Sequence, residues 1–355
     1  MNAEIFAEWL SRQGHKVIRT ASSYWYDAGP RVLQAFPYHW LIEPSNKEVR
    51  DLMLGRGIAA LRYSTPLAAS SGAISYHVVL RSPYHLEVLR AQARNGVRRG
   101  LSCFRVERIA FERLAEEGWI LQRDTLERQG RIKSMSCSAW QRICRSAVGL
   151  PGFEAWGATF EGQLAASLLT TRIDDTFYVP YAQSHSNFLR RHVNNALFYT
   201  VSCDLLAQPG VTGIFFGLHS LDAPESIDEF KFRMGFAAKS VRQRVVFHPL
   251  LEPFSTATVH RVLVRSCARF PGNPMLSKAE GMLRFRLLGQ RPLDDQAWPA
   301  CLAEPTSEIA SPKDSTASTP RNDSSRTTAS ASLRDSALKD RARKDFAGGA
   351  QHESA

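Results

Sequence analysis

Arginines at helical spacing are the side chains of this sequence best suited to bind an anion. Arg90, Arg94 and Arg98 recur at i, i+4 and i+8, so on one helix over residues 86–99 they would form a basic stripe. Three like charges stacked on one face destabilise a helix unless an anion screens them. The stripe therefore predicts a polyphosphate partner: a nucleotide-linked acceptor, a lipid diphosphate or tRNA. A plain solvated helix face is the alternative interpretation.

Motifs for several other chemistries are missing from the sequence. There is no G-x-S-x-G elbow, no Walker A loop and no G-x-G-x-x-G after a strand. His, Cys, Asp and Glu nowhere cluster at metal-ligand spacing, so we expect no metal. The six cysteines lie far apart without a C-x-x-C pair, which is typical of reduced thiols in a cytoplasmic protein.

The elements that would position a site are clearest between residues 151 and 250. Two apolar runs, 162–172 and 176–183, flank a turn at Asp174-Asp175 and predict an antiparallel hairpin. Helical spacing then extends from 192 to 208 and stops at Pro209-Gly210. The run 213–218 is apolar on both faces, as in a buried strand. A hairpin, a helix and a buried strand together predict a βαβ crossover in a mixed sheet.

Further elements follow, and the pattern repeats weakly along the chain. We expect a helix over 225–234 and a closing strand over 241–247. Strand-like runs begin at Gly57 and Ile74, and a helical pattern lies near Leu86. The corresponding elements of the second half begin at Gly162 and Thr176 and lie near Val193, which is 102–107 residues later in each case. This order predicts an internal duplication.

Length and composition set the broad class of the protein. At roughly 150 residues per domain, 355 residues suggest about two domains. No window approaches the roughly 18 apolar residues of a membrane-spanning helix, and the first residues lack the apolar core of a secretory signal. Residues 303–355 contain few large apolar side chains and as many acidic as basic residues, so we expect a disordered tail. The net charge of +11 therefore belongs to residues 1–302.

Four segments carry a resemblance to a known family. These are LRAQARNGVRRGL at 89–101, RRHVNNALFYTVSCDLLAQPG at 190–210, GIFFGL at 213–218 and DEFKFRMGF at 228–236. In this order they resemble the GNAT acyltransferase superfamily, and more narrowly its FemAB-like branch, whose members carry two GNAT-like domains in tandem. The resemblance implies an α/β fold with a GNAT-like domain over 1–105 that is degenerate in catalysis. The resemblance further implies three segments after it: a GNAT-like acyltransferase domain over 106–250, a helical cap over 251–302 and the tail over 303–355.

The resemblance also implies a donor-binding loop. In the superfamily the loop before the central helix reads (Q/R)-x-x-G-x-(G/A), and its backbone amides bind the pyrophosphate of acyl-CoA. The pattern falls here on Arg191, Asn194 and Ala196, with Asn in place of the middle Gly. Asn tolerates a positive φ better than most residues, so the turn could be kept. The implied contacts of acyl-CoA or acetyl-CoA are Arg190, Arg191, Val193, Asn194, Asn195 and Ala196. An ordinary helix N-terminus is the alternative, because FemAB-like proteins generally lack this motif.

Catalytic residues are implied in the same way. Many GNAT enzymes place a Tyr four residues before the Gly of the closing Gly-Phe, and Lys231 occupies that place here. A Lys is what the FemAB-like branch shows, where it is associated with stabilising charge in the transition state. Tyr181 and His185 are candidates for the base that takes a proton from the attacking amine. Alternatively, Lys231 only pairs with Asp228 or Glu229.

These features together favour an acyltransferase. It would move an acyl group from acyl-CoA to an amine of a small acceptor, for example an amino sugar or another precursor of cell-surface polysaccharide, and Arg90, Arg94 and Arg98 would contact that acceptor. Two other classes stay open. One is a FemAB-type peptidyltransferase that uses aminoacyl-tRNA and binds it in a salt-dependent way. The other is a catalytically silent binding protein of the same fold.

Overall fold

The computed structural model describes residues 3–130, 135–220, 228–270 and 273–302, all within one compact unit, Met1–Glu304. The predicted tail over 303–355 lies outside the described residues. The first elements in chain order are α1 (Ala3–Arg12), β1 (Val17–Arg19), β2 (Tyr24–Gly29), β3 (Val32–Phe36), α2 (Asn46–Leu54), β4 (Ala60–Thr65), β5 (Ala73–Arg81), α3 (Ala91–Cys103), β6 (Arg105–Ile109), α4 (Phe111–Arg128) and α5 (Cys137–Ser146). They are followed by β7 (Phe153–Phe160), β8 (Gln163–Ile173), β9 (Thr176–Ser184), α6 (Ser186–Leu189), α7 (Val193–Leu206), β10 (Gly213–Leu218), α8 (Glu229–Arg233), β11 (Ala237–Phe247), α9 (Ala257–Arg269) and α10 (Pro274–Gly289).

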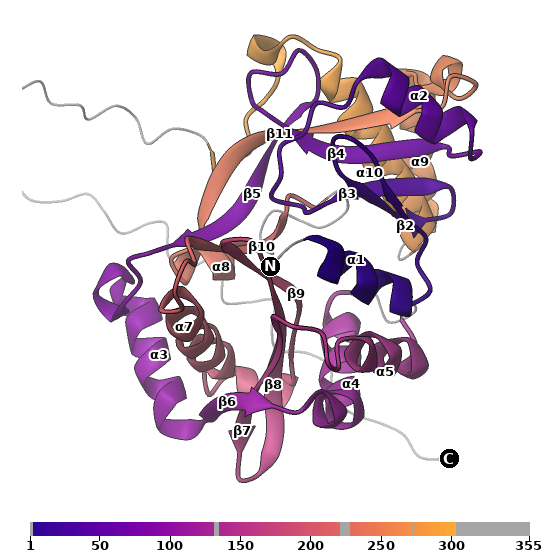
Figure 1. The fold of residues 1–355 in the computed structure, drawn as a ribbon. Coiled ribbons are helices and arrows are strands. Elements are labelled where there is room, and N and C mark those ends of the chain that lie inside the picture. Colours follow the sequence, from indigo (N-terminus) through magenta and orange to yellow (C-terminus); the bar gives the residue numbers. More distant parts are fainter. Residues whose placement is uncertain (1–2, 131–134, 221–227, 271–272, 303–355) are drawn as a thin grey trace, which may run out of the picture. The chain divides into compact units, whose positions relative to one another are not determined.

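The strands of the described residues form one mixed sheet of eleven strands, in the order β1-β2-β3-β4-β11-β5-β10-β9-β8-β7-β6 (Figure 1). Two neighbouring pairs are parallel, β3 with β4 and β9 with β10. A helix connects the strands of each parallel pair, α2 in the first half (β1–β5) and α7 in the second half (β6–β11), as parallel pairing requires. The same βαβ unit therefore occurs once in each half.

The two halves exchange one strand at the centre of the sheet. β11, the last strand of the second half, pairs antiparallel with β4, and β5, the last strand of the first half, pairs antiparallel with β10. β5 and β11 also pair with each other (Figure 1). The expected strand over 241–247 is thus present, but it lies in the middle of the sheet between two strands of the first half.

Helices cover both faces of the second half of the sheet (Figure 1). On one face, α3 and α7 pack over a core that includes Val97, Val193 and Leu197. On the other face, α1, α4 and α5 close a second core that includes Trp9 and Trp140. In the first half, α2 packs on Trp25 and Leu33, and α10 packs on Val245 through Met282 and Phe285.

The mixed α/β fold predicted from the sequence is confirmed. β8 and β9 form the expected hairpin, α7 covers most of the expected helix, and β10 is the expected strand inside the sheet. Of the helix expected over 225–234, the structure describes α8 (Glu229–Arg233), and residues 225–227 lie outside the described part of the chain. The expected boundary between residues 105 and 106 falls inside β6, the edge strand of this single sheet, and the domain limits stay a prediction. Two helices occupy most of 251–302.

The expected basic helix begins later than predicted. Residues Leu86–Val88 form a separate 3₁₀ turn, and the buried Leu89 and the N-cap Arg90 both have extended backbones. Because Leu89 is anchored in the core, the chain bends there and the α-helix starts only at Ala91. Arg90 therefore does not belong to the helical stripe that was predicted from its spacing. None of the described helices is long and apolar enough to cross a membrane.

Candidate functional site

The parallel strands β9 and β10 separate after a short paired segment. They pair from Thr176 to Tyr178 and from Gly213 to Phe215. Beyond that point, the register of β9 on β8 shifts across Val179 and Pro180, and the register of β10 on β5 shifts at Phe216. Proline has no N–H to donate to a neighbouring strand, which favours such an irregularity. The two bulges leave an opening between the strands.

A cavity of about 220 Å³ lies at this opening. Both halves of the chain line it. The first half contributes Tyr26, Gln34, Tyr38 and Arg62, and the second half contributes Tyr178, Val179, Pro180, Phe215, Phe216, Gly217 and Leu218. The carboxyl ends of β9 and β10 point the same way, so the cavity opens at the end of the sheet where α7 begins.

Tyr178 of the cavity wall forms a hydrogen-bonded pair with His39, which lies outside the lining. The Tyr178 hydroxyl accepts the backbone N–H of His39 at 3.2 Å and also bonds Nδ1 of the same residue. Burial lowers the pKa of His39 to about 4 and raises the pKa of Tyr178 well above its ordinary value. At neutral pH the imidazole is therefore uncharged and the phenol protonated, and the tautomer of His39 with its proton on Nε2 lets Tyr178 donate to Nδ1. This arrangement can pass a proton between the cavity and the imidazole.

A second tyrosine pair and an arginine complete the polar wall. The Tyr38 hydroxyl donates to the Tyr26 hydroxyl at 2.8 Å. The guanidinium of Arg62 bonds Oε1 of Gln243 through Nε at 3.0 Å and through a terminal nitrogen at 2.6 Å. It also donates to the backbone carbonyl of His219 at 3.1 Å. These bonds fix a positive charge beside the cavity, where it can stabilise an oxyanion.

Lys231 lies behind this wall and is paired with a buried acid. Its Nζ is 2.6 Å from Oδ1 of Asp228, and the two side chains are 19% and 4% exposed. Oδ2 of the same carboxylate accepts the Tyr76 hydroxyl at 3.0 Å. The Lys231 ammonium lies 4.4 Å from the ring centroid of Phe216, which itself lines the cavity. The pairing that the sequence offered as the alternative is therefore present, and the catalytic role of Lys231 stays a prediction.

Tyr181 lies away from the α7 side of the sheet. Regular alternation along the run 176–183 would put Tyr181 on one face with Phe177 and Val179, but the bulge at Val179 and Pro180 reverses it. Tyr181 instead packs in the core below α1 and α5, with its ring edge-on to Trp9 and Trp140. Burial raises its pKa, which disfavours the phenolate that a base would need.

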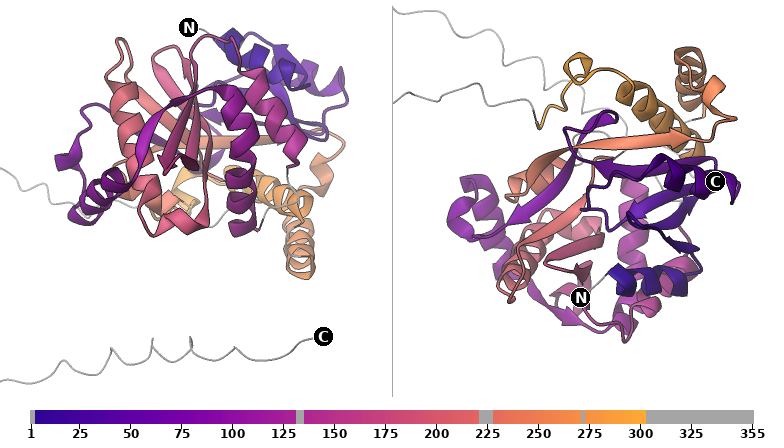
Figure 2. Two further views of the ribbon diagram at one scale, coloured as in Figure 1. Left: turned by 90° about the horizontal axis from the view of Figure 1, so that it is seen from below. Right: turned by 45° about the horizontal axis from the view of Figure 1, so that its top comes forward.

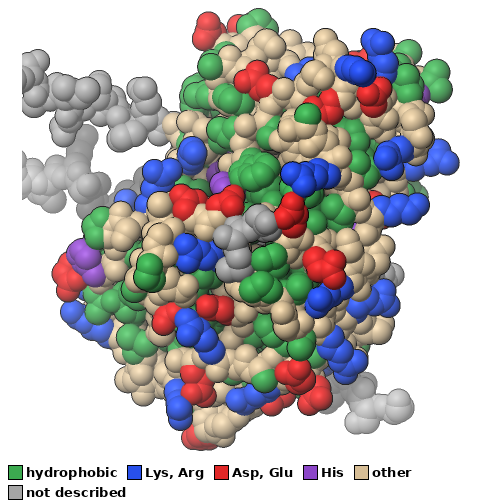
Figure 3. Space-filling view, in the orientation of Figure 1, with side chains coloured by type: hydrophobic (Ala, Val, Ile, Leu, Met, Phe, Trp, Pro, Cys, Tyr) green, Lys and Arg blue, Asp and Glu red, His purple; other side chains and the backbone are tan. Residues whose placement is uncertain are grey.

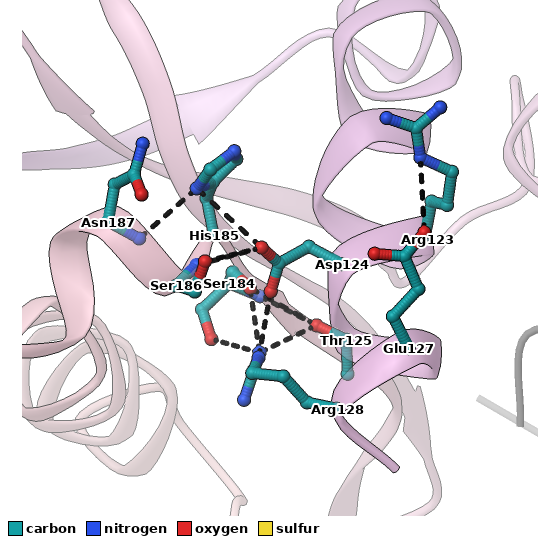
Figure 4. Close-up of polar contacts among 9 residues, drawn as sticks. All are labelled: Arg123, Asp124, Thr125, Glu127, Arg128, Ser184, His185, Ser186 and Asn187. Carbon is teal, nitrogen blue, oxygen red and sulfur yellow. Dashed lines mark hydrogen bonds and ion pairs between the residues drawn. The ribbon is translucent and has the colours of Figure 1, made fainter. Parts of the chain in front are cut away.

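His185 caps a helix (Figure 4). Its Nδ1 accepts the backbone N–H of Asn187 at 3.2 Å, at the start of α6. Asp124 of α4 lies 3.7 Å from the same Nδ1 and accepts the Ser186 hydroxyl at 2.7 Å. Burial by itself would raise the pKa of Asp124, but the hydrogen bonds from Ser186 and Arg128 lower this pKa below its ordinary value. Because Nδ1 already accepts an N–H, this nitrogen is not available as a base; the cluster holds the end of β9 against α4.

The predicted donor loop precedes α7, but its turn differs from the expected one. The left-handed residue is His192 (φ 62°), the N-cap, whereas Asn194 lies in the first turn of the helix. Ala196 donates its N–H to the carbonyl of His192 at 3.2 Å, so this amide is already used. The side chains of Val193 and Ala196 are buried. The amides of the first helical turn lack intrahelical acceptors by geometry, which leaves Val193, Asn194 and Asn195 as the backbone donors of the predicted site.

The side chains of the loop divide between solvent and neighbouring elements. Arg190 and Arg191 are exposed, and the Arg191 guanidinium lies 4.5 Å from the ring centroid of Phe160. The side-chain amide of Asn195 contacts the sulfur of Met234 at 3.3 Å. One flank of the first turn is covered by α3, where a Cβ added at Gly100 would lie 2.5 Å from the His192 carbonyl oxygen. The flank of the first turn of α7 that is not covered by α3 therefore carries Arg190 and Arg191.

The arginines proposed to bind the acceptor lie on α3 or just before it. Arg94 is half-exposed and Arg98 exposed on the helix, while Arg90 precedes it. α3 packs on α7 through its glycine face. Among the described residues, the cavity lining includes none of the three arginines, and their role stays a prediction.

Comparison of the fold with solved structures gives one match that decides its type. The crystal structure of FemX superposes with a TM-score of 0.50 at 13% sequence identity, over 70% of this chain and 92% of FemX. The chain has the FemAB-like tandem GNAT fold. L-PGS from Bacillus licheniformis matches more weakly (TM-score 0.46, 12% identity, 81% of this chain and 97% of that one). A tandem GNAT protein from the clavulanic acid biosynthesis pathway matches with a TM-score of 0.40 and 13% identity, over 65% and 81% of the two chains. No family model and no curated protein sequence matches the chain.

The tandem GNAT fold explains why sequence reasoning missed half of the cavity. Tyr26, Tyr38 and Arg62 line the cavity from the first half, and His39, the partner of Tyr178, also comes from this half, where the sequence indicated no catalytic residue. Their signal in the sequence is a concentration of aromatic and basic residues in the runs YWYDAG, YHW and ALRYST. The exchange of β5 and β11 joins both halves in one sheet, and residues of these runs meet β9 and β10 at the cavity.

Proposed function

We propose that the protein is an acyltransferase that moves an acyl group from acyl-CoA to an amine. The observation that carries the proposal is the cavity at the separation of β9 and β10, at the end of the sheet where α7 begins. The first-turn amides of α7 and the exposed Arg190 and Arg191 supply positive charge for the donor phosphates. A donor held there would extend along β9 and place its thioester carbonyl in the cavity.

The side chains of the cavity would support the transfer as follows. The amine nitrogen attacks the thioester carbon, a C–N bond forms and the C–S bond breaks. The proton lost by the amine passes to the Tyr178 oxygen while the Tyr178 proton passes to Nδ1 of His39. His39 has a lowered pKa, so it readily returns this proton through Tyr178 to the departing thiolate, which leaves as free CoA. Arg62 faces the oxyanion of the intermediate, and most of the rate enhancement comes from positioning and electrostatics.

The first half of the chain would bind the acceptor. Tyr26, Gln34 and Tyr38 bring hydroxyl and amide groups to the cavity, and such groups suit a polyhydroxylated amine. A cavity of about 220 Å³ fits the reacting end of a small acceptor. We therefore include in the proposal an amino sugar, or another amine of a cell-envelope or polysaccharide precursor, as the acceptor class.

Donor binding and turnover are tested separately with the full-length protein. Acetyl-CoA at about 100 times its Kd should raise the free energy of unfolding by about 2.7 kcal/mol. Arg191→Glu should abolish this stabilisation, and Arg50→Glu, an exposed arginine of α2, should leave it unchanged. Release of CoA thiol in the presence of amino sugars then reports turnover. If no thioester stabilises the protein, acyl-CoA is not its donor. If a thioester stabilises the protein but no amine is acylated, the protein is a binding protein.

The fold match to FemX favours a second candidate, a FemAB-type transferase that uses aminoacyl-tRNA. This function requires a wide basic surface for the RNA backbone. On the face drawn in Figure 3, Lys and Arg side chains are interspersed with Asp and Glu, so this face is not such a surface. A gel-shift titration with tRNA at increasing salt distinguishes the two: tight binding that weakens steeply with salt would replace acyl-CoA by aminoacyl-tRNA.

A further inference from the structure

An apolar groove lies between α9, α10 and the turn that connects β2 and β3, and its volume is about 340 Å³. From α10 it is lined by Met275, Ala279 and Met282, which recur at helical spacing and therefore lie on one face of that helix. From α9 it is lined by Val259 and Leu263, which are one turn apart. α9 lies at the periphery of the molecule in both views of Figure 2. The groove is therefore enclosed between the facing sides of two helices at the edge of the molecule.

The walls of the groove are apolar, and part of them is exposed. Phe254 and Met275 line it and are 63% and 64% exposed. The sheet contributes Ala60 and Phe247. Among the described residues of the lining, Lys278 is the only one that carries a charge. Large apolar side chains that stay exposed around a concave site with a single charged group are typical of a ligand-binding groove.

The positive charge of Lys278 is available to a ligand. Lys278 is exposed, and the carboxylates of the neighbouring elements pair with other residues. Glu280 of α10 lies 2.8 Å from Nε2 of His260, and Glu252 before α9 pairs with an arginine of α10. No carboxylate occurs among the described residues that line the groove. An anionic group at its rim would therefore meet one ammonium group and no competing negative charge.

The volume of the groove fits one alkyl chain. A methylene group occupies about the volume of a water molecule in the liquid, roughly 30 Å³, so the groove accommodates roughly 11 such groups. This is the length of the alkyl chain of dodecanoate. A lipid with two such chains would need about twice the volume. A single turn of α-helix, about 10 Å across and 5.4 Å long, occupies roughly 400 Å³ and is already too large. The size therefore favours a single chain over a lipid bilayer or a helix of another protein.

We propose that this groove binds a fatty acid of medium chain length. The alkyl chain lies between α9 and α10, where Phe254 and Met275 cover it, and the carboxylate lies beside Nζ of Lys278. The groove shares no lining residue with the cavity between β9 and β10. The proposal therefore does not depend on the proposed acyl transfer.

The first test is isothermal titration calorimetry of the full-length protein with octanoate, decanoate, dodecanoate and tetradecanoate. Each step adds two methylene groups and should tighten binding about fifteenfold, because each buried methylene contributes about 0.8 kcal/mol. The gain should end at dodecanoate, since further carbons would lie outside the groove. Affinity that continues to rise at tetradecanoate, or no binding of any carboxylate, would overturn the proposal.

Two pairs of variants test the occupant and its orientation. Ala279→Phe adds six carbons to the groove and fills roughly half of it, so the gain with chain length should end near octanoate. Ala268→Phe, at an exposed position of α9 outside the lining, should not change this limit. Lys278→Glu should reverse the preference for dodecanoate over dodecyltrimethylammonium, which has the same chain length and the opposite charge. Arg265→Glu, also exposed and outside the lining, should keep that preference.

The outcomes separate a ligand from other occupants of the groove. Unchanged thermal unfolding of the four variants without ligand checks the fold. An unchanged chain-length limit in Ala279→Phe, or an unchanged preference in Lys278→Glu, would overturn the proposal. Sedimentation velocity identifies a second copy of the chain as the alternative occupant. A dimer that dissociates in Ala279→Phe and binds no carboxylate would assign the groove to that contact instead.

Discussion

Replacing Gly100 with alanine should push α3 away from the first turn of α7. A Cβ at this position would lie 2.5 Å from the His192 carbonyl oxygen and 3.0 Å from the Cβ of Ala196. The carbonyl belongs to the backbone and accepts the N–H of Ala196, so it cannot move without distorting the start of α7. The substitution therefore tests whether α3 holds the predicted donor loop in place.

The magnitude follows from two opposing effects. Alanine is favoured over glycine inside a helix by about 1 kcal/mol. Overpacking costs about 1–3 kcal/mol, and the upper end applies because the contact is with backbone. We expect a net loss of about 2 kcal/mol in the free energy of unfolding, and weaker binding of acyl-CoA, since the first-turn amides of α7 would shift.

Gly96→Ala on the same helix is the matched control. Its Cβ would meet the side chain of Asn195, with Nδ2 at 2.9 Å and Cγ at 3.1 Å. A side chain can rotate away, so this variant should stay within about 1 kcal/mol of the unmodified protein. Urea unfolding followed by tryptophan fluorescence measures both variants. Equal stability of the two variants would refute the argument that α3 is fitted to the backbone of α7.

Three further predictions concern the cavity and the buried charges. Tyr178→Phe should lower kcat by about a hundredfold with little change in donor affinity, because it removes the proton path to His39. Lys231→Met should destabilise the protein by about 3–5 kcal/mol, because the buried Asp228 loses its ion-pair partner, and adding Asp228→Asn should recover part of this loss. Burial lowers the pKa of His77 to about 3 and that of His39 to about 4, whereas both take up a proton near pH 6.5 when unfolded. The free energy of unfolding should therefore fall as the pH decreases from 6.5 to 4, by up to about 1.4 kcal/mol per pH unit for each histidine.

Each of these predictions has its own check. Steady-state kinetics with Tyr24→Phe, a tyrosine outside the cavity lining, controls for the loss of a hydroxyl, and equal activity of both variants would contradict the proton path. Unchanged stability of Lys231→Met in urea would show that Asp228 does not need its partner. A free energy of unfolding that stays constant between pH 6.5 and 4 would contradict the burial of neutral histidines.

Local sequence patterns predicted the second half of the fold well. The hairpin β8–β9, α7 and β10 are determined by alternation, helical spacing and a double-sided apolar run, all of which depend on neighbouring residues. Tyr181 was misplaced because the bulge at Pro180 reverses the alternation that the pattern assumes. The stripe that included Arg90 was misplaced because burial of Leu89 interrupts the helix.

Long-range pairing was beyond such patterns. The run at 58–66 contains β4, and the spacing of about 100 residues matched it with β8. In the structure β4 follows a parallel crossover, as β10 does, so β10 is its counterpart in the second half. Strand order depends on which chain segments meet in space, and a count of residues does not carry that information. The cavity residues of the first half were missed for the same reason.

The exchange of β5 and β11 has a consequence for how the chain is made on the ribosome. β4 ends at Thr65, and the strand that covers its inner edge begins only at Ala237. At roughly 5–20 residues per second, β4 must wait roughly 10–30 s for this partner. During that time its edge presents unpaired N–H and C=O groups, which is the condition under which nascent chains pair with one another. Conditions that slow synthesis between these strands should therefore increase aggregation of the newborn protein more than they change the stability of the finished one.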